Sequence, residues 1–213
     1  MARTEREKLL ETIERLRGSP LSRVIESRLD LFRRNHESGR DVWFSELSFC
    51  ILVAASPARA GLRAQHHLGP GGFLSMGERQ LQHALRSLGV RFHNRARYIV
   101  RARGLPDLKE RVLSLRDVTR ARDWLVDNVM GIGYKEASHF LRNVGFLGVA
   151  ILDRHIVSVL HEAGCLPKSE PPNTRDDYME DERAVIDLAR ESSTLPGELD
   201  LYLWYLRTGD VVK

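Results

Sequence analysis

The spacing of apolar residues constrains this chain most, because nearly every periodic segment repeats at the helical interval and strand-like alternation is scarce. Thr4 and Glu7 form a capping-box pattern ahead of an apolar stripe, and Ser75 with Glu78 repeat that pattern later in the chain. The segment from Trp43 to Val53 is apolar on nearly every face, which predicts a central buried helix. We therefore expect an all-α protein.

Glycine and proline indicate where the predicted helices end. The run Gly69-Pro70-Gly71-Gly72 predicts a plain turn. Gly145 stands where a left-handed C-cap is favoured, and two later helices are expected to end at Gly164 and Gly209. Further helices are predicted from apolar stripes that run through Leu21–Phe32, Val118–Val129, Ala137–Val144, Ile156–Leu160, Val185–Leu188 and Leu199–Leu206.

Charge, cysteine and histidine content limit the classes of function. The 213 residues include 33 basic and 29 acidic side chains, so with a net charge of +4 any attraction to nucleic acid depends on where the charges lie. The N-terminus is charged, and no apolar run of about 18 residues occurs. Cys50 and Cys165 supply neither a disulfide framework nor the four ligands of a metal cluster or structural zinc site. His139 and His155 lack a third metal ligand at a plausible spacing, so we expect them to pack or form hydrogen bonds. We expect a cytoplasmic protein that needs no metal or other cofactor and binds no membrane.

A Gly-x-Gly turn, Gly131-Ile132-Gly133, joins two predicted helices. Because the turn opens directly into a helix, free backbone N–H groups and the positive end of the helix dipole are available to an anion. The absence of side chains at Gly131 and Gly133 lets a phosphate approach closely. This helix-hairpin-helix pattern, over about 118–145, predicts contacts to a nucleic-acid backbone.

Lys135 follows the hairpin in the first turn of its helix, and Asp153 stands at the expected N-cap of a later helix. An attacking amine must be neutral, whereas an ordinary lysine is almost fully protonated at pH 7. A first-turn position that is partly withdrawn from water disfavours the ammonium form. Alone, Lys135 is more often a solvated side chain and Asp153 a structural cap, but together after such a hairpin they indicate a catalytic pair.

The densest basic stretch is residues 91–103, which hold five arginines and two aromatic residues. We expect Arg91, Arg95 and Arg97 to lie against phosphates. Phe92, near the start of this helix, could wedge into a duplex. The alternative is an ordinary solvated helix face.

These motifs together resemble the helix-hairpin-helix DNA glycosylase superfamily, in the branch that uses a lysine. Residues 135–145, 49–52 and 203–209 resemble the type 2 8-oxoguanine DNA glycosylases/AP lyases of archaea and some bacteria, and the resemblance spans almost the whole chain. It implies one glycosylase unit over 1–213, with a central helical lobe at about 35–145, a terminal lobe from about 1–34 plus 146–213, and the active-site cleft between them. Two cysteines exclude the four-cysteine iron-sulfur cluster of the endonuclease III branch.

The resemblance also implies a reaction on double-stranded DNA that contains oxidised guanine. The damaged nucleotide leaves the duplex, Lys135 forms a Schiff base as 8-oxoguanine is expelled, and β-elimination then cuts the strand on the 3′ side. Asp153 would oppose positive charge that develops on the sugar. Base recognition would come from Trp204, which stacks on the purine, from Lys213 at the C-terminal end, and from Phe92. The enzyme would act as a monomer on the nucleoid.

Alternatives stay open at this point. The same machinery could excise another oxidised base, such as a pyrimidine, because pocket residues decide between lesions. A non-catalytic helix-hairpin-helix DNA-binding module would need neither Lys135 nor Asp153. Trp204 could belong to the core, and Lys213 could be a frayed end.

Overall fold

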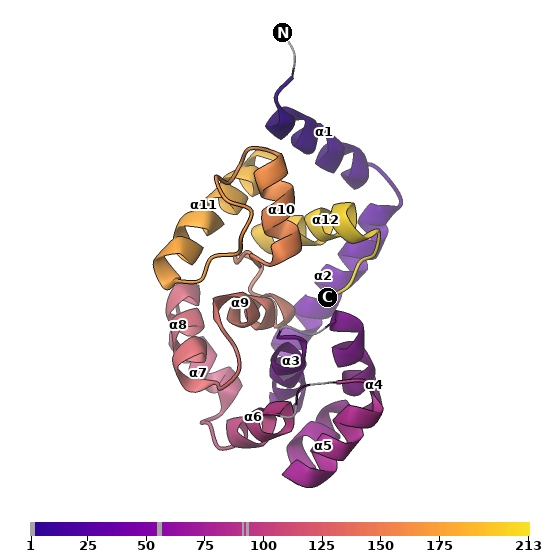
Figure 1. Cartoon of the computed structure of the whole chain (residues 1–213), viewed down its shortest axis with the longest axis vertical. Coiled ribbons are helices and arrows are strands. Elements are labelled where there is room, and N and C mark those ends of the chain that lie inside the picture. Colours follow the sequence, from indigo (N-terminus) through magenta and orange to yellow (C-terminus); the bar gives the residue numbers. More distant parts are fainter. Residues whose placement is uncertain (1–2, 55–56, 91, 93) are drawn as a thin grey trace. The chain divides into compact units, whose positions relative to one another are not determined.

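The computed structural model describes residues 3–54, 57–90, 92 and 94–213, and every regular element in these ranges is an α-helix (Figure 1). The helices belong to two compact units. The terminal unit comprises Met1–Phe32 and Gly145–Lys213, and the central unit comprises Arg33–Val144. The predicted all-α fold is confirmed.

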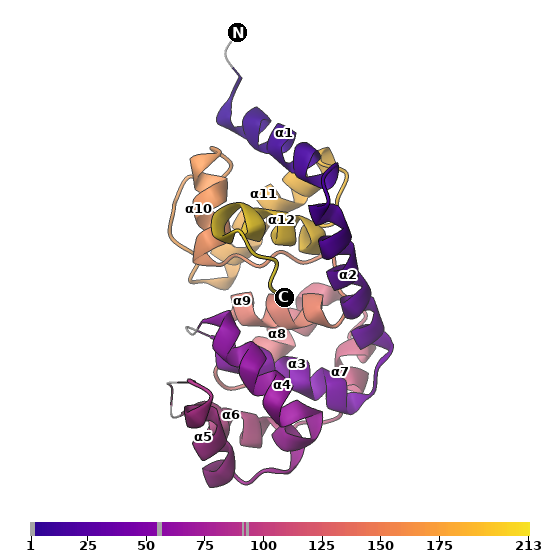
Figure 2. The same ribbon diagram turned by 90° about the vertical axis from the view of Figure 1, so that its right-hand side faces the viewer.

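The central unit is built around α3 (Arg40–Val53). All of its residues from Trp43 to Val53 are buried, and the helix packs against α4, α6, α7 and α9 (Figure 2). This confirms the central buried helix that its apolar sequence predicts. The other helices of this unit are α4 (Ala58–Ser75), α5 (Glu78–Ser87), α6 (Asn94–Ala102), α7 (Leu108–Ser114), α8 (Val118–Asn128) and α9 (Tyr134–Asn143).

Two local predictions in the central unit are wrong. The chain does not simply turn at Gly69, because α4 kinks there (φ 60°, ψ 178°) and continues as a helix from Pro70 to Ser75. Proline suits a first helical position, since its missing N–H has no intrahelical partner there. The capping box before α5 is not formed by Ser75: the N-cap is Gly77, whose N–H donates to the Gln80 side chain at 3.3 Å.

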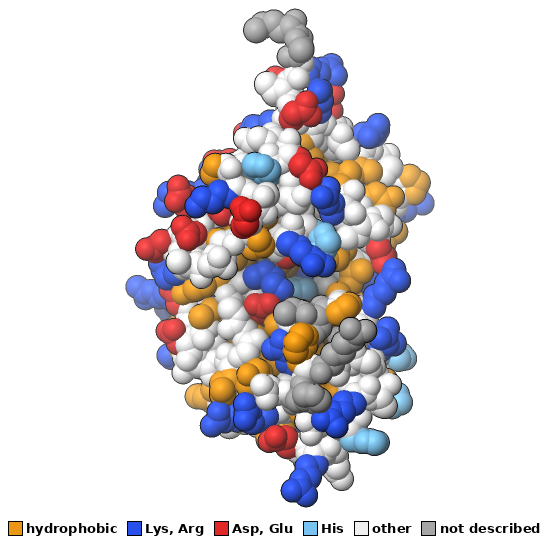
Figure 3. Space-filling model, viewed as in Figure 1, with side chains coloured by type: hydrophobic (Ala, Val, Ile, Leu, Met, Phe, Trp, Pro, Cys, Tyr) orange, Lys and Arg blue, Asp and Glu red, His pale blue; other side chains and the backbone are white. Residues whose placement is uncertain are grey.

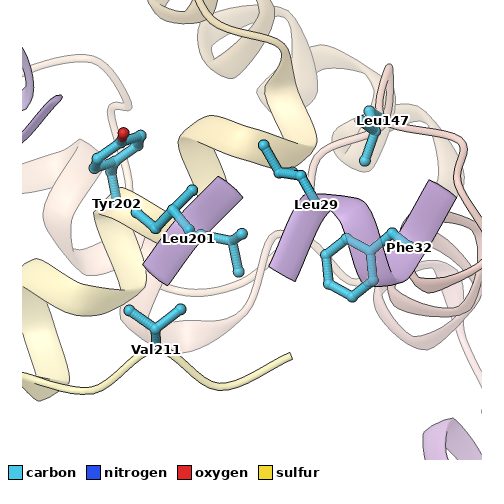
Figure 4. Close-up of a cluster of buried hydrophobic side chains, with 7 residues drawn as sticks. Leu29, Phe32, Leu147, Leu201, Tyr202 and Val211 are labelled. Carbon is cyan, nitrogen blue, oxygen red and sulfur yellow. The ribbon is translucent and has the colours of Figure 1, made fainter. Parts of the chain in front are cut away.

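The terminal unit contains α1 (Glu5–Arg17), the first part of α2 (Leu21–Glu37), α10 (Arg154–Glu162), α11 (Arg175–Glu191) and α12 (Pro196–Thr208). α12 packs against α1, α10 and α11. Its Leu201 and Tyr202 join Leu29 and Phe32 of α2 and Val211 of the C-terminal segment in one buried apolar cluster (Figure 4). Burial of such side chains stabilises the unit by about 25 cal/mol per Å² of apolar surface.

Helix ends follow the predicted signals at several places. The Thr4–Glu7 capping box is present at α1, and Gly145 has the positive φ that its predicted left-handed C-cap requires. Gly164 and Gly209, where two later helices were expected to end, also have a positive φ. Helix α7, which begins after the Asp107 N-cap, was not predicted. Among the helices described, none has the length and apolar character that a bilayer crossing requires.

Candidate active site

The helix-hairpin-helix connects α8 to α9 through a tight turn at Gly131. Gly131 has a φ of +86°, and a Cβ atom added there would lie 2.3 Å from Cδ2 of Tyr98. Gly133 is the N-cap of α9, and its carbonyl accepts from the N–H of Ala137 at 2.9 Å. The sequence predicts that the glycines allow a phosphate to approach closely. In the structure, the Tyr98 ring occupies the space beside Gly131.

Arg95 fixes this turn from α6. Its Nη1 donates to the Gly131 carbonyl at 3.3 Å and its Nη2 donates to the Ala54 carbonyl. Burial lowers the pKa of the guanidinium, and the nearby Glu136 carboxylate opposes that change. With 9% of its surface exposed, Arg95 does not fit the expected contact to a phosphate.

The periodicity of α6 could have identified Arg95 as a buried residue. Arg95, Ile99 and Ala102 recur at helical spacing, and all three are buried. Arg97 is exposed, with its guanidinium carbon 5.8 Å from the centre of the Tyr98 ring. Helices α5 and α6 carry further exposed arginines: Arg79, Arg86 and Arg101. Figure 3 shows several basic side chains over the lower part of the view.

Phe92 precedes α6 and is 49% exposed, with the Arg95 guanidinium 5.3 Å from its ring centre. An exposed aromatic ring is free to stack on another ring. Arg91, predicted to bind phosphate, lies outside the described residues.

Lys135 lies in the first turn of α9, as predicted. Its Nζ is 2.7 Å from Oε1 of Glu136, and its side chain is 29% exposed. The other carboxylate oxygen of Glu136 accepts from the Gly133 N–H at 3.0 Å. Glu136 therefore connects the hairpin backbone to the lysine amine, a role that the sequence interpretation did not include. Its position three residues after a glycine N-cap was the available signal.

Asp153 is the N-cap of α10, as predicted. Its Oδ1 accepts from the N–H groups of His155 at 2.8 Å and Ile156 at 2.9 Å. Within the described residues, Oδ2 has no hydrogen-bond partner. Asp153 thus keeps one oxygen available while the other is fixed by the helix.

Two buried side chains of α11 hold the segment that leads to Asp153. The Tyr178 hydroxyl accepts from the Leu152 N–H at 3.2 Å and donates to the Ala150 carbonyl at 2.8 Å. Glu182 accepts from the Ala150 N–H at 2.9 Å. The sequence interpretation missed both residues, although their i, i+4 spacing places them on one face of the helix.

Trp204 and the C-terminal segment belong to the same unit as Asp153. The Trp204 ring lies edge-on to the His155 ring, with 5.0 Å between the centres. Its Nε1 is buried and has no hydrogen-bond partner among the described residues. Lys213 is 8% exposed, and the carbonyl of nearby Val211 accepts from Arg28 at 3.4 Å, so this segment is held in place rather than frayed.

His139, Cys50 and Cys165 do not form a metal site with other described residues. His139 packs edge-on against Phe49 with ring centres 5.5 Å apart, which confirms the predicted packing role. Cys50 and Cys165 are free thiols. The described residues contain no cluster of three or more potential histidine, cysteine or carboxylate ligands.

The site residues are therefore divided between the units. Lys135, Glu136 and the hairpin belong to the central unit, while Asp153, Trp204 and Lys213 belong to the terminal unit. That Lys135 and Asp153 act on one nucleotide stays a prediction.

Comparison with known proteins shows which family the chain resembles. The profile of a family described as 8-oxoguanine DNA glycosylase matches residues 25–194. The chain is 43% identical to an 8-oxoguanine DNA glycosylase/AP lyase of Methanocaldococcus jannaschii over 206 residues, which is 96% of this chain and 99% of that protein.

Solved structures give the same result. The crystal structure of the M. jannaschii 8-oxoguanine glycosylase/lyase with a 15mer DNA containing 8-oxoguanine matches with a TM-score of 0.93 and 42% identity, covering 97% of this chain and 100% of that one. The 8-oxoguanine DNA glycosylase of Thermotoga maritima matches with a TM-score of 0.91 and 38% identity, covering 98% of this chain and 100% of that one.

Proposed function

Because this chain belongs to the 8-oxoguanine DNA glycosylase family, we propose that it excises 8-oxoguanine from double-stranded DNA and then cuts the strand as an AP lyase. Relatives about as long as this chain have names that combine both activities. One similar structure holds DNA that contains 8-oxoguanine. Within this chain, the observation that carries the proposal is a lysine amine in the first helical turn after a Gly-x-Gly hairpin.

The hairpin supports the role of Lys135 as nucleophile because backbone N–H groups at a helix N-terminus bind phosphate. Because the Gly133 N–H already donates to Glu136 at 3.0 Å, DNA held by Gly131 and Arg97 would pass beside the amine. The neutral Nζ bonds to C1′ of the everted nucleotide while the C1′–N9 bond breaks, and that electron pair leaves with the base. The nitrogen loses a proton, the C1′–O4′ bond opens as O4′ gains a proton, and a Schiff base results.

Strand cleavage follows from the same intermediate. The imine makes the C2′ hydrogen acidic, so a base removes it as a proton. The electron pair forms the C2′–C3′ double bond, and the C3′–O3′ bond breaks with its electron pair on the departing phosphate. One nucleophile therefore serves both activities.

Asp153 would stabilise positive charge on the sugar as the C1′–N9 bond breaks. Its capped Oδ1 fixes the direction of the side chain, and its other oxygen has no partner in the described residues. Tyr178 and Glu182 would support this geometry by holding the preceding segment. Held groups stabilise a developing charge without reorganising during the reaction.

Recognition of the base is assigned to Trp204, Lys213 and Phe92. Trp204 offers an aromatic face for a purine and an indole N–H without a partner in the described residues. Oxidation makes N7 of guanine a hydrogen-bond donor, so an acceptor at the end of the chain would distinguish it. Exposed Phe92 would contact the duplex beside the lesion.

The protein would act as a monomer in the cytoplasm on nucleoid DNA. One copy of the chain supplies both Lys135 and Asp153, which supports this assignment. Light scattering with and without a lesion duplex tests it.

A panel of labelled duplexes tests the proposed function. Duplexes with 8-oxoguanine, thymine glycol or undamaged guanine are incubated with the protein and borohydride, and covalent products are resolved on a denaturing gel. We expect a trapped product on the 8-oxoguanine duplex. Trapping only on thymine glycol would assign another oxidised base, and binding without any covalent product would indicate a non-catalytic module.

A further inference from the structure

Glu136 makes two different contacts at the start of α9. Its Oε2 accepts from the Gly133 N–H at 3.0 Å, while its Oε1 lies 2.7 Å from Nζ of Lys135. The first contact fixes the carboxylate as part of a capping arrangement, so the second holds the amine at a defined place. Residue 136 is thus both a helix cap and the counter-ion of the proposed nucleophile.

The surroundings of this ion pair make it stronger than an ordinary surface pair. The Glu136 side chain is 12% exposed. On α6, Arg95 interacts electrostatically with Glu136, and Tyr98 packs against the hairpin at Gly131.

Two further helices that pack against α9 also carry charged residues. Glu46 of α3 accepts from Asn143 at the opposite end of α9, and Arg122 of α8 is buried. A carboxylate withdrawn from water and fixed by backbone holds a cation more effectively than a mobile one.

We propose that Glu136 is a positioning residue whose carboxylate, fixed by the hairpin backbone, holds the Lys135 amine beside the hairpin. This inference rests on the proposed function, since it concerns the same nucleophile. For attack on C1′, one N–H bond of the ammonium must break, with the proton going to water and the electron pair staying on Nζ. The adjacent carboxylate attracts the ammonium, so removal of its charge should change how trapping depends on pH.

Glu136→Gln separates the two contacts. The glutamine side-chain oxygen can still accept from the Gly133 N–H, because Gln also completes a capping box, but the negative charge beside Lys135 is gone. The assay measures single-turnover trapping with cyanoborohydride on an abasic-site duplex, from pH 5 to 9 at constant ionic strength. An abasic site removes base recognition from the measurement.

We expect trapping by Glu136→Gln to be about tenfold faster at the acidic end of the pH range, because the charge that opposes loss of the proton is gone. DNA affinity should not change. Glu136→Ala should accelerate trapping equally at acidic pH but also lower Tm, because it loses the cap. Measuring both variants well below their Tm keeps the test valid.

Glu7→Gln is the matched control. Glu7 occupies the corresponding position of the α1 capping box, where its Oε2 accepts from the Thr4 N–H at 2.8 Å, and it has no lysine ion pair in the described residues. Its profile should coincide with that of the wild type. A rate profile of Glu136→Gln that equals the wild-type profile would overturn the inference. Trapping by the wild type would still uphold the proposed function in that case. A rate lost at every pH would also overturn the inference, since Glu136 would then accept the proton itself. No trapping by the wild type would overturn both.

Discussion

The Tyr98 ring fills the space that a side chain on Gly131 would need. An ideal Cβ at Gly131 would lie 2.3 Å from Cδ2 and 2.7 Å from Cε2 of the ring, which is far inside van der Waals contact. The backbone φ of +86° excludes most other residues independently. The hairpin is therefore built against α6, and its conformation depends on residues well before it in the sequence.

Gly131→Ala should destabilise the protein and impair DNA binding. Left-handed backbone costs about 1–2 kcal/mol for a residue with a Cβ, and the clash with Tyr98 adds roughly 1–3 kcal/mol. Gly164→Ala is the control, because Gly164 has a φ of +70° but no atom within 4 Å of the added Cβ. Chemical unfolding should give the larger loss for Gly131→Ala, and equal losses would contradict the packing argument.

Arg97→Ala and Arg95→Ala should have different effects. Exposed Arg97 should contact a phosphate, so its removal weakens binding to damaged and undamaged duplexes alike and reduces the slope of log K against log salt by about 0.9. Removal of buried Arg95 leaves carbonyls of Ala54 and Gly131 without that donor and should lower the free energy of unfolding by about 1–3 kcal/mol. Salt titrations and urea unfolding measure the two quantities. An unchanged salt slope in Arg97→Ala would remove this residue from the DNA contact.

Lys135→Gln should abolish borohydride trapping and base release while duplex binding is largely retained. The amide cannot form a Schiff base, whereas the hairpin N–H groups that bind phosphate are unaffected. Lys168→Gln, a change at an exposed lysine of the loop before α11, serves as the control and should behave as the wild type. Excision retained by Lys135→Gln would refute the assignment of the nucleophile.

Asp153→Asn should slow base release by roughly 100-fold, the effect expected when one electrostatic contact to a transition state is lost. Asparagine is as good an N-cap as aspartate, so α10 and the thermal stability should be preserved. Asp117→Asn changes the N-cap of α8, which accepts from Arg120 N–H at 2.7 Å, without touching the proposed site. If Asp153→Asn releases the base at the wild-type rate, as the control Asp117→Asn should, Asp153 is only a cap.

Local signals explain why much of the site could be predicted from the sequence. The hairpin glycines, the first-turn position of Lys135 and the N-cap role of Asp153 each depend on residues within one or two turns. The Thr4 capping box is of the same kind. Such short-range patterns survive in any tertiary context that keeps the helix.

The errors arose where distant packing decides the outcome. A dense run of arginines suggested one phosphate-binding surface, but Arg95 is buried and, of the pair, only Arg97 is exposed. Tyr178 and Glu182 support the Asp153 segment from another helix, so no local motif identifies them. At Gly69, turn-forming composition was correct for the kink but could not show that the helix continues.

Lys213→Ala and deletion of Lys213 should separate base excision from strand cleavage. Lys213 is buried, and the segment before it is fixed by Arg28 and by the packing of Val211, so its removal should alter a defined pocket rather than a frayed end. Loss of a group that reads the oxidised base should reduce 8-oxoguanine excision by about 10-fold or more, the size expected for one hydrogen bond to a substrate. Cleavage of an abasic-site duplex needs no base contact, so it should continue at nearly the wild-type rate. The two rates are measured by single-turnover assays on matched duplexes. If deletion lowers both rates equally, the segment supports the fold, and if neither rate changes, Lys213 takes no part in discrimination.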